Sequence, residues 1–231
     1  MICITMINTI NNELKQLYET YLTELKKATH GIGDQFSHPI LMHVFDDYEK
    51  VNRKVMFVGK ETYSWYGTME NSERLNVDLI LDNYKDFELA KDYHGKNSPF
   101  WSFIKTIHHR LNGEEHPLGF LYTNFSKCDS HKTTPSPELQ KLNEKGFDLI
   151  KEEIKISKPD VVIFITGWEY ENQFQRVFQG LGYETLIENY LYKCKHAELP
   201  AHSYMTMHPK ALRLRKKFES VMEGILKAVG N

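Results

Sequence analysis

The stretch "KVMFVGKETYSWYG", residues 54–67, decides the fold class of this chain. Its first half is an apolar run with too little alternation for a strand that has one face in water. This pattern indicates a strand covered on both faces, as in a parallel sheet flanked by helices. In such sheets ligands bind beyond the carboxyl ends of the strands. Because Glu61 and Tyr63 follow this strand closely, the sequence predicts an active site in the loop.

The second half of the chain repeats the alternation of apolar runs and helical segments. A continuous apolar run followed by a helix-forming segment is typical of strand–helix units in a doubly wound, parallel α/β fold. Two shorter strand candidates, "YETLIENYLYKC" and "HSYMTM", precede the last helix. The clearest repeats of the pattern are "LGFLYTNFSKC" (118–128) and "KPDVVIFITG" (158–167).

The N-terminal region has a different pattern. Apolar residues recur at helical spacing over residues 9–29, and a glycine ends that helix. A linker then leads into the first strand. We therefore predict two parts, an N-terminal helical extension with its linker over residues 1–50 and a single globular domain over residues 51–231.

Composition excludes several classes of protein. The apolar fraction of 41% and the aromatic fraction of 13% indicate a packed globule rather than a disordered chain. A formal charge of −2 gives no general attraction to nucleic acid or to anionic membranes, so any basic surface must be local. With no apolar run near the roughly 20 residues of a membrane span and no signal peptide pattern, we expect a cytoplasmic protein with no membrane partner.

The cysteines indicate no cofactor. Cys3, Cys128 and Cys194 are far apart and odd in number, and none belongs to a C-x-x-C pattern. Neither a disulfide framework nor a zinc or iron–sulfur site is therefore expected, and no histidine spacing indicates another metal. We predict a metal-free protein without a cofactor.

Three predicted strand ends carry side chains suited to chemistry: Glu61 with Tyr63, Asn124, and His208 followed by Pro209. Taken singly, each has an ordinary interpretation. A glutamate or asparagine after a strand often completes a turn or caps a helix, and His-Pro often begins one. Since the carboxyl ends of parallel strands share one edge of a sheet, the combination favours a functional site.

The ordered motifs resemble the uracil-DNA glycosylase superfamily, and in particular a group of poorly characterised bacterial members. The resemblance covers roughly residues 54 to 215 and implies a three-layer α/β/α fold around a central four-stranded parallel sheet, with the N-terminal helix outside it. The family carries a water-activating loop after its first strand and a His-Pro loop before its last helix. The segments that match are "VGKETY", "LYTNFSKC", "KPDVVIFITG" and "TMHPKALR", and "NSPFW" resembles a phenylalanine-bearing segment of the mismatch-specific branch.

This resemblance implies two catalytic residues. Glu61 matches the acidic residue of the water-activating loop, which would orient a water and stabilise positive charge on the deoxyribose. His208 matches the histidine of the His-Pro loop, which would donate to the carbonyl of the leaving base. The chemistry agrees, because breaking an N-glycosidic bond makes an electron-poor sugar and an anionic base.

The resemblance also implies base-binding residues. Tyr63 would form a wall that blocks the methyl group of thymine, and the amide of Asn124 would bond the Watson–Crick edge of uracil. Phe100 is the ring expected to stack on the base, which must be flipped out of the helix. Gly59 and Lys60, at the start of the glutamate loop, complete the predicted base-binding set.

Positive charge is dense only in "HPKALRLRKK", residues 208–217. Lys210 beside the His-Pro loop is predicted to contact a DNA phosphate, and Leu212 or Arg213 to fill the space left by a flipped base. For residues 215–217, the exposed face of an amphipathic helix is an equally good interpretation.

The leading hypothesis is a monomeric DNA glycosylase that hydrolyses the N-glycosidic bond of uracil or a related damaged base in single- or double-stranded DNA. Two alternatives stay open. One is a catalytically silent nucleic-acid or nucleotide-binding protein of the same fold. The other is an unrelated α/β hydrolase acting on a nucleoside or phosphate ester, which the lack of G-x-S-x-G, Walker and metal motifs disfavours.

Overall fold

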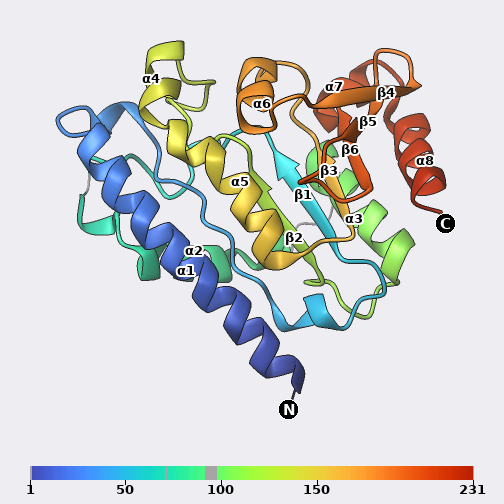
Figure 1. The fold of residues 1–231 in the computed structure, drawn as a ribbon, viewed down its shortest axis with the longest axis horizontal. Helices are drawn as coiled ribbons and strands as arrows, with labels where there is room; N and C mark the ends of the chain where they lie inside the picture. The colour runs from blue at the N-terminus through green and yellow to red at the C-terminus, as the bar shows by residue number, and fades with distance from the viewer. Residues whose placement is uncertain (1, 71, 92–97, 231) are drawn as a thin grey trace. The chain divides into compact units, whose positions relative to one another are not determined.

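The computed structural model is an α/β protein with a mixed sheet and helices of very different lengths (Figure 1). It describes residues 2–70, 72–91 and 98–230. The α/β class predicted from the sequence is confirmed. The helices of the described residues are α1 (Ile2–Ala28), α2 (Val77–Phe87), α3 (Pro99–Asn112), α4 (Pro137–Leu142), α5 (Glu144–Ser157), α6 (Glu171–Val177), α7 (Pro209–Leu214) and α8 (Phe218–Val229).

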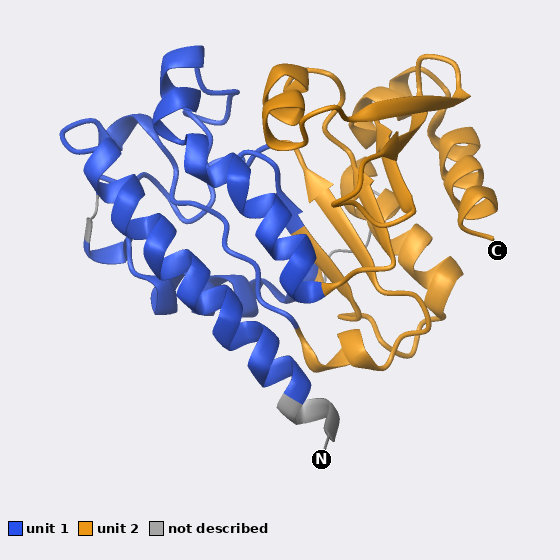
Figure 2. Ribbon diagram, in the orientation of Figure 1, with its two compact units in different colours: residues 1–44, 61–89, 123–157 blue, residues 45–60, 90–122, 158–231 orange. Residues whose placement is uncertain are grey.

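The chain forms two compact units, each assembled from separate stretches of sequence (Figure 2). Unit 1 comprises residues 1–44, 61–89 and 123–157, and unit 2 comprises residues 45–60, 90–122 and 158–231. This division differs from the predicted extension over residues 1–50 and domain over residues 51–231. A division of this kind leaves no linker or composition change in the sequence, because the chain passes between the units five times.

The sheet has six strands in the order β2-β1-β3-β6-β5-β4, and all of it belongs to unit 2 except the last two residues of β2. Strands β1, β3 and β6 are parallel to one another, whereas β5 is antiparallel to β6 and β4 to β5. The strands are β1 (Val55–Gly59), β2 (Phe120–Asn124), β3 (Val161–Phe164), β4 (Gly182–Ile187), β5 (Leu191–Lys195) and β6 (His202–Thr206).

The sequence analysis expected a four-stranded, all-parallel sheet. The prediction is wrong in the number of strands, which is six, and in the direction of the strands at one edge, which are antiparallel. The segment "YETLIENYLYKC" folds into the antiparallel hairpin β4–β5 and extends the sheet. Asn189 in its turn has a φ of 64°, and the N–H of Tyr190 donates to the carbonyl of Ile187 at 2.9 Å. Asparagine tolerates this left-handed conformation better than most residues, which favours a tight turn here.

Both faces of the sheet in unit 2 are covered by helices. On one face the ring of His108 from α3 lies 5.1 Å from Phe120, which in turn lies 5.7 Å from Phe57. Phe164 pairs in register with Val58, the neighbour of Phe57, so its side chain points to the opposite face. There Phe174 of α6 packs edge-on against Phe164 at 5.1 Å. This burial on two faces explains the continuous apolar run that the sequence shows.

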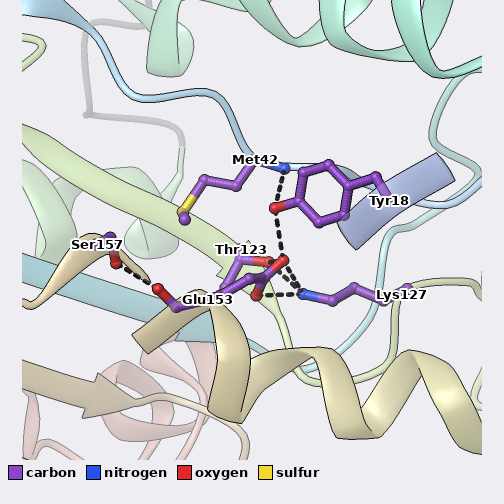
Figure 3. A network of polar contacts seen from close by, with 6 residues as sticks. All are labelled: Tyr18, Met42, Thr123, Lys127, Glu153 and Ser157. Atoms are coloured by element: carbon purple, nitrogen blue, oxygen red, sulfur yellow. Dashed lines mark hydrogen bonds and ion pairs between the residues drawn. The ribbon is translucent and has the colours of Figure 1, made fainter. Parts of the chain in front are cut away.

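Unit 1 is organised around the packing of α1 against α5 and α2. The apolar positions of α1 predicted from the sequence do form a buried face, since Leu14, Tyr18 and Leu22 are all almost fully buried. At the centre of this unit lies a network of buried polar groups that the sequence analysis did not predict (Figure 3).

The network is built on a buried ion pair. The Lys127 ammonium lies 2.8 and 2.7 Å from the two carboxylate oxygens of Glu153 in α5, and it donates to the Thr123 hydroxyl at 2.5 Å (Figure 3). The Tyr18 hydroxyl donates to the same carboxylate at 2.9 Å and accepts from the N–H of Met42 at 3.2 Å. A buried ion pair is tolerated when further hydrogen bonds satisfy its polar atoms, as they do here.

Candidate active site

The site predicted from the sequence falls partly in unit 2 and partly in unit 1. Gly59, Lys60, Phe100 and His208 belong to unit 2, and the glutamate loop belongs to unit 1. The chain itself joins the two parts, because Glu61 follows Lys60 directly.

In unit 2 the loops after β1, β3 and β6 meet at the carboxyl edge of the parallel strands. The N–H of Gly167, after β3, donates to the carbonyl of Thr206 at the end of β6 at 3.0 Å. Lys60, after β1, forms an ion pair with Glu169, after β3. His208 follows β6 by two residues. The residues that follow three neighbouring strands thus bring a cation, a carboxylate and an imidazole to this edge of the sheet.

His208 is held in one orientation at the start of α7. Its Nδ1 accepts a hydrogen bond from the N–H of Lys210 at 3.3 Å, so His208 acts as the cap of this helix. An Nδ1 that accepts a bond carries no proton in the neutral ring, which leaves the proton on Nε2. The ring also stacks on Phe100, with the centroids 5.4 Å apart and the planes 22° apart. These contacts present an N–H donor from a fixed imidazole.

Several effects lower the pKa of His208 below its ordinary value. Burial of the ring is the largest, the cations Lys60 and Lys210 act in the same direction, and Glu169 opposes them. A lowered pKa keeps the imidazole neutral at pH 7. The edge of unit 2 therefore combines a neutral donor with nearby positive charge.

Aromatic rings surround the predicted stacking residue. Phe100 packs edge-on against Trp101 at 5.1 Å and against Tyr122 at 5.7 Å, and these two rings lie 5.0 Å from each other. The helix that carries Phe100 begins where the Ser98 hydroxyl accepts from the N–H of Trp101 at 3.3 Å. The cluster fixes the Phe100 ring beside His208. Its stacking on a nucleobase stays a prediction.

In unit 1 the glutamate loop is fastened to other segments. The Thr134 hydroxyl donates to Oε1 of Glu61 at 3.2 Å. The hydroxyl of Thr62 lies 2.7 Å from that of Ser37, which also accepts from the N–H of Asp129 at 2.9 Å. The buried carboxylate of Asp129 accepts from the N–H of Ser64.

The backbone of this loop is strained. Tyr63, Ser64 and Tyr66 have φ values of 54°, 60° and 57°, in the left-handed region that non-glycine residues rarely adopt. Strain of this kind persists where surrounding contacts hold the chain, and it clusters at functional sites.

Two predicted base-binding residues of unit 1 have contrasting surroundings. Tyr63 is 72% exposed, and the ammonium of Lys132 lies 5.5 Å from its ring centroid. Asn124, the last residue of β2, is buried. The strand end thus holds an amide inside the protein, whereas the glutamate loop presents a phenol ring to solvent.

The predicted DNA-binding residues also differ. Lys210 and Arg213 are exposed, and the Arg213 guanidinium lies 4.8 Å from the ring of Phe218. Leu212 is fully buried, because it lies on the inner face of α7. The prediction that Leu212 fills the space left by a flipped base therefore does not fit this structure. The exposed leucine of this helix is Leu214, at 77%.

Sequence reasoning missed three residues around the site. Glu169 follows a buried strand and a glycine in "FITGWE", so the same rule that selected Glu61 also selects this carboxylate. Asp129 directly follows the apolar run of residues 118–128, so the rule that ligands bind beyond strand ends selects it as well. Nothing in the sequence indicates Thr134, whose contact with Glu61 joins residues 73 positions apart.

Metal ligands, reactive thiols or membrane-spanning helices among the described residues would indicate other classes of function. No three histidine, cysteine, aspartate or glutamate side chains gather there as a metal site requires. Burial raises the pKa of both Cys128 and Cys194 to about 12, so neither thiol is a nucleophile near neutral pH. Within residues 2–70, 72–91 and 98–230, no helix has the length and apolar character needed to cross a membrane.

The comparisons with known proteins leave the family open. The chain matches no protein-family model, and no curated protein matches its sequence.

Proposed function

We propose that this protein is a DNA glycosylase that hydrolyses the N-glycosidic bond of uracil or a related damaged base. The observation that carries the proposal is the state of His208. The ring accepts a backbone N–H at Nδ1, is stacked on Phe100, and has a lowered pKa. A neutral imidazole with its proton on Nε2 is suited to donate to an oxygen that becomes negative as the base leaves.

The surroundings of His208 support the same chemistry. Uracil departs as an anion, and a fixed donor with cations nearby stabilises developing negative charge without reorganising. Lys60 and Lys210 both act electrostatically on His208. In this positive field the charged imidazolium is the less stable form.

The carboxylate of Glu61 supplies the complementary group. Cleavage leaves positive charge on the deoxyribose, and a carboxylate stabilises that charge and orients the attacking water. In this proposal Glu61 acts on the sugar side of the bond and His208 on the base side. Glu61 belongs to the loop that directly follows β1, and the Thr134 hydroxyl binds its carboxylate.

The remaining predicted residues recognise the base. A flipped base loses its stacking and pairing, which costs a few kcal/mol and must be recovered in the protein. We assign the stacking to Phe100, the hydrogen bonds to the base edge to the Asn124 amide, and the exclusion of thymine to Tyr63. In this proposal Gly59 and Lys60, at the end of β1, also contact the base.

The test is direct cleavage of labelled DNA. Single- and double-stranded oligonucleotides that carry uracil, hypoxanthine or a mismatched thymine are incubated with the protein and then treated with alkali. Cleavage at one modified base identifies the substrate. Glu61→Gln should abolish excision but keep DNA binding, and His208→Ala should lower the rate on the order of 100-fold to 1,000-fold.

Matched controls separate chemistry from general damage. Glu219→Gln and His30→Ala change the same residue types at exposed positions of α8 and of the turn after α1, and both should leave excision unchanged. Full activity of Glu61→Gln would refute the assigned mechanism. DNA binding without excision by the unaltered protein would instead identify a catalytically silent binding protein.

A further inference from the structure

We propose that Thr134 is a positioning residue for the Glu61 carboxylate, and that the turn formed by residues 129–134 is a structural part of the active site. This inference rests on the proposed glycosylase function. It starts from the hydrogen bond of 3.2 Å that the Thr134 hydroxyl donates to Oε1 of Glu61.

The turn is itself rigid. Ser130 and Thr133 exchange two backbone hydrogen bonds of 3.0 and 2.9 Å. The Asp129 carboxylate accepts from the N–H of Lys132 at 3.4 Å. A closed turn of this kind holds its side chains in place without help from a substrate.

Thr134 has restricted backbone and side-chain angles. It precedes Pro135, a buried residue whose carbonyl accepts from the Gln140 side chain at 2.8 Å. A residue before proline is restricted in its backbone angles, and the β-branched side chain of threonine is restricted at χ1. The hydroxyl is therefore presented to Glu61 from a stiff support.

The same turn also holds the backbone of the glutamate loop. Asp129 accepts from the N–H of Ser64, three residues after Glu61, through the same carboxylate that binds the turn. Lys132 lies over the ring of Tyr63 at 5.5 Å. Three residues of the turn, Asp129, Lys132 and Thr134, thus contact three residues of the loop.

This arrangement matters because contacts from other segments fasten the glutamate loop. Three of its residues have left-handed backbone angles, and a carboxylate at the end of two rotatable carbons has several rotamers. A donor on one carboxylate oxygen selects one rotamer and fixes the plane of the group. Catalysis depends steeply on such geometry, since a misplacement of about 1 Å costs on the order of 100-fold in rate.

The test compares three variants in single-turnover excision assays. Thr134→Val keeps the shape of the side chain but removes the donor, and it should lower the rate of bond cleavage on the order of 10-fold to 100-fold with unchanged DNA affinity. Thr134→Ser keeps the hydroxyl and should retain most of the activity. Thr185→Val removes an exposed hydroxyl on β4, outside the proposed site, and should leave the rate unchanged.

A double-mutant cycle separates positioning from structural damage. In a Glu61→Asp background, which keeps a carboxylate but shortens its reach toward Thr134, Thr134→Val should cause little further loss of rate, because the hydrogen bond is already broken. A rate for Thr134→Val equal to that of the unaltered protein would overturn the proposal. So would an equal loss of rate for Thr185→Val.

A second cycle, measured by urea unfolding, reports the contact without using activity. Coupling between Thr134→Val and Glu61→Ala in unfolding supports the contact, and strictly additive losses contradict it. If the unaltered protein excises no base, the proposed function fails and the catalytic role of Thr134 fails with it. Excision by the unaltered protein with no effect of Thr134→Val overturns only the role of Thr134.

Discussion

Two lysine–glutamate pairs, one in each unit, show how the surroundings of an ion pair decide its use. Lys127 and Glu153 in unit 1 are fully buried, and Tyr18 and Thr123 complete their hydrogen bonds. The pair in unit 2 is partly open to water, with 20% of the Lys60 side chain and 60% of the Glu169 side chain exposed.

The charged groups of the buried pair find their hydrogen-bond partners inside unit 1. Burial lowers the pKa of Lys127, and the neighbouring Glu153 carboxylate opposes that shift. Burial also raises the pKa of Tyr18 well above its ordinary range, so its hydroxyl stays protonated and donates. With its polar atoms satisfied inside the protein, this pair is suited to holding α1, α5 and the segment after β2 together.

The pair of Lys60 and Glu169, at the edge of the sheet, acts on the imidazole of His208. Lys60 lowers the pKa of His208 and Glu169 raises it, so the two charges adjust a neighbouring imidazole in opposite directions. Glu153 of the buried pair also raises the pKa of Tyr18, so the difference between the pairs is where they act: the partly exposed pair acts on a group at the edge of the sheet, and the buried pair on groups inside unit 1.

The largest effect is expected when the buried pair is broken. Lys127→Met leaves the Glu153 carboxylate buried without its cation, and it should cost about 3–5 kcal/mol of unfolding free energy. Lys60→Met, at the edge, should cost about 1 kcal/mol or less. Urea unfolding of the two variants measures both values, and similar losses would contradict the comparison.

A double variant separates the cost of the unpaired carboxylate from the cost of altered packing. Replacing both charges, by Lys127→Met with Glu153→Leu, removes the uncompensated charge and should recover part of the loss. If the double variant is no more stable than Lys127→Met alone, the cost comes from packing rather than from the buried carboxylate.

An intermediate effect is expected on the titration of His208. In the folded protein its pKa lies below the ordinary value of about 6.5, so the ring is neutral at pH 7 and gains its proton only as the pH falls below that value. Lys60→Met should raise the pKa, because a cation that disfavours the imidazolium is gone. Glu169→Gln should lower it further, because a favourable carboxylate is gone.

NMR titration of the His208 ring measures these shifts, with His208→Ala used to assign its signals. If both variants shift the pKa of His208 in the same direction, Lys60 and Glu169 do not act on it in opposite directions. In the proposed enzyme the acid side of the pH dependence of excision should move with this pKa. It should move to higher pH in Lys60→Met and to lower pH in Glu169→Gln.

The smallest effect is expected at Lys210, an exposed cation that acts on His208 in the same direction as Lys60. If Lys210 contacts a DNA phosphate, Lys210→Ala should weaken binding to all sequences alike and reduce the salt slope of log K by about 1. Binding measured at several salt concentrations tests this, and an unchanged slope would exclude the contact.

Much of the fold was predictable because its signals are local. Residues 55–58 and 161–164 are buried on both faces, as their continuous apolar runs indicate, and the α1 face follows from helical spacing. The hairpin β4–β5 was harder, because its strands are short and β4 is partly exposed at the edge of the sheet. Such a strand needs no apolar run.

The candidate site was predictable only in part. The rule that chemistry follows strand ends selected Glu61, Asn124 and His208 as the residues to inspect. The same rule applied to Glu169 as well, yet a carboxylate in a loop has many ordinary uses. Burial of Leu212 depends on which side of α7 faces the protein, and six residues carry too weak a periodic pattern to show it.

The α/β class, the positions of the parallel strands and the residue types at their ends follow from the sequence, because burial and backbone preference depend on neighbouring residues. The partners of the polar side chains follow from the fold. Thr134 reaches Glu61 across 73 positions, and Lys127 reaches Glu153 across 26. Hydrogen bonds and ion pairs act over a few ångströms in space, and a linear pattern does not record which distant residues the fold brings within that range.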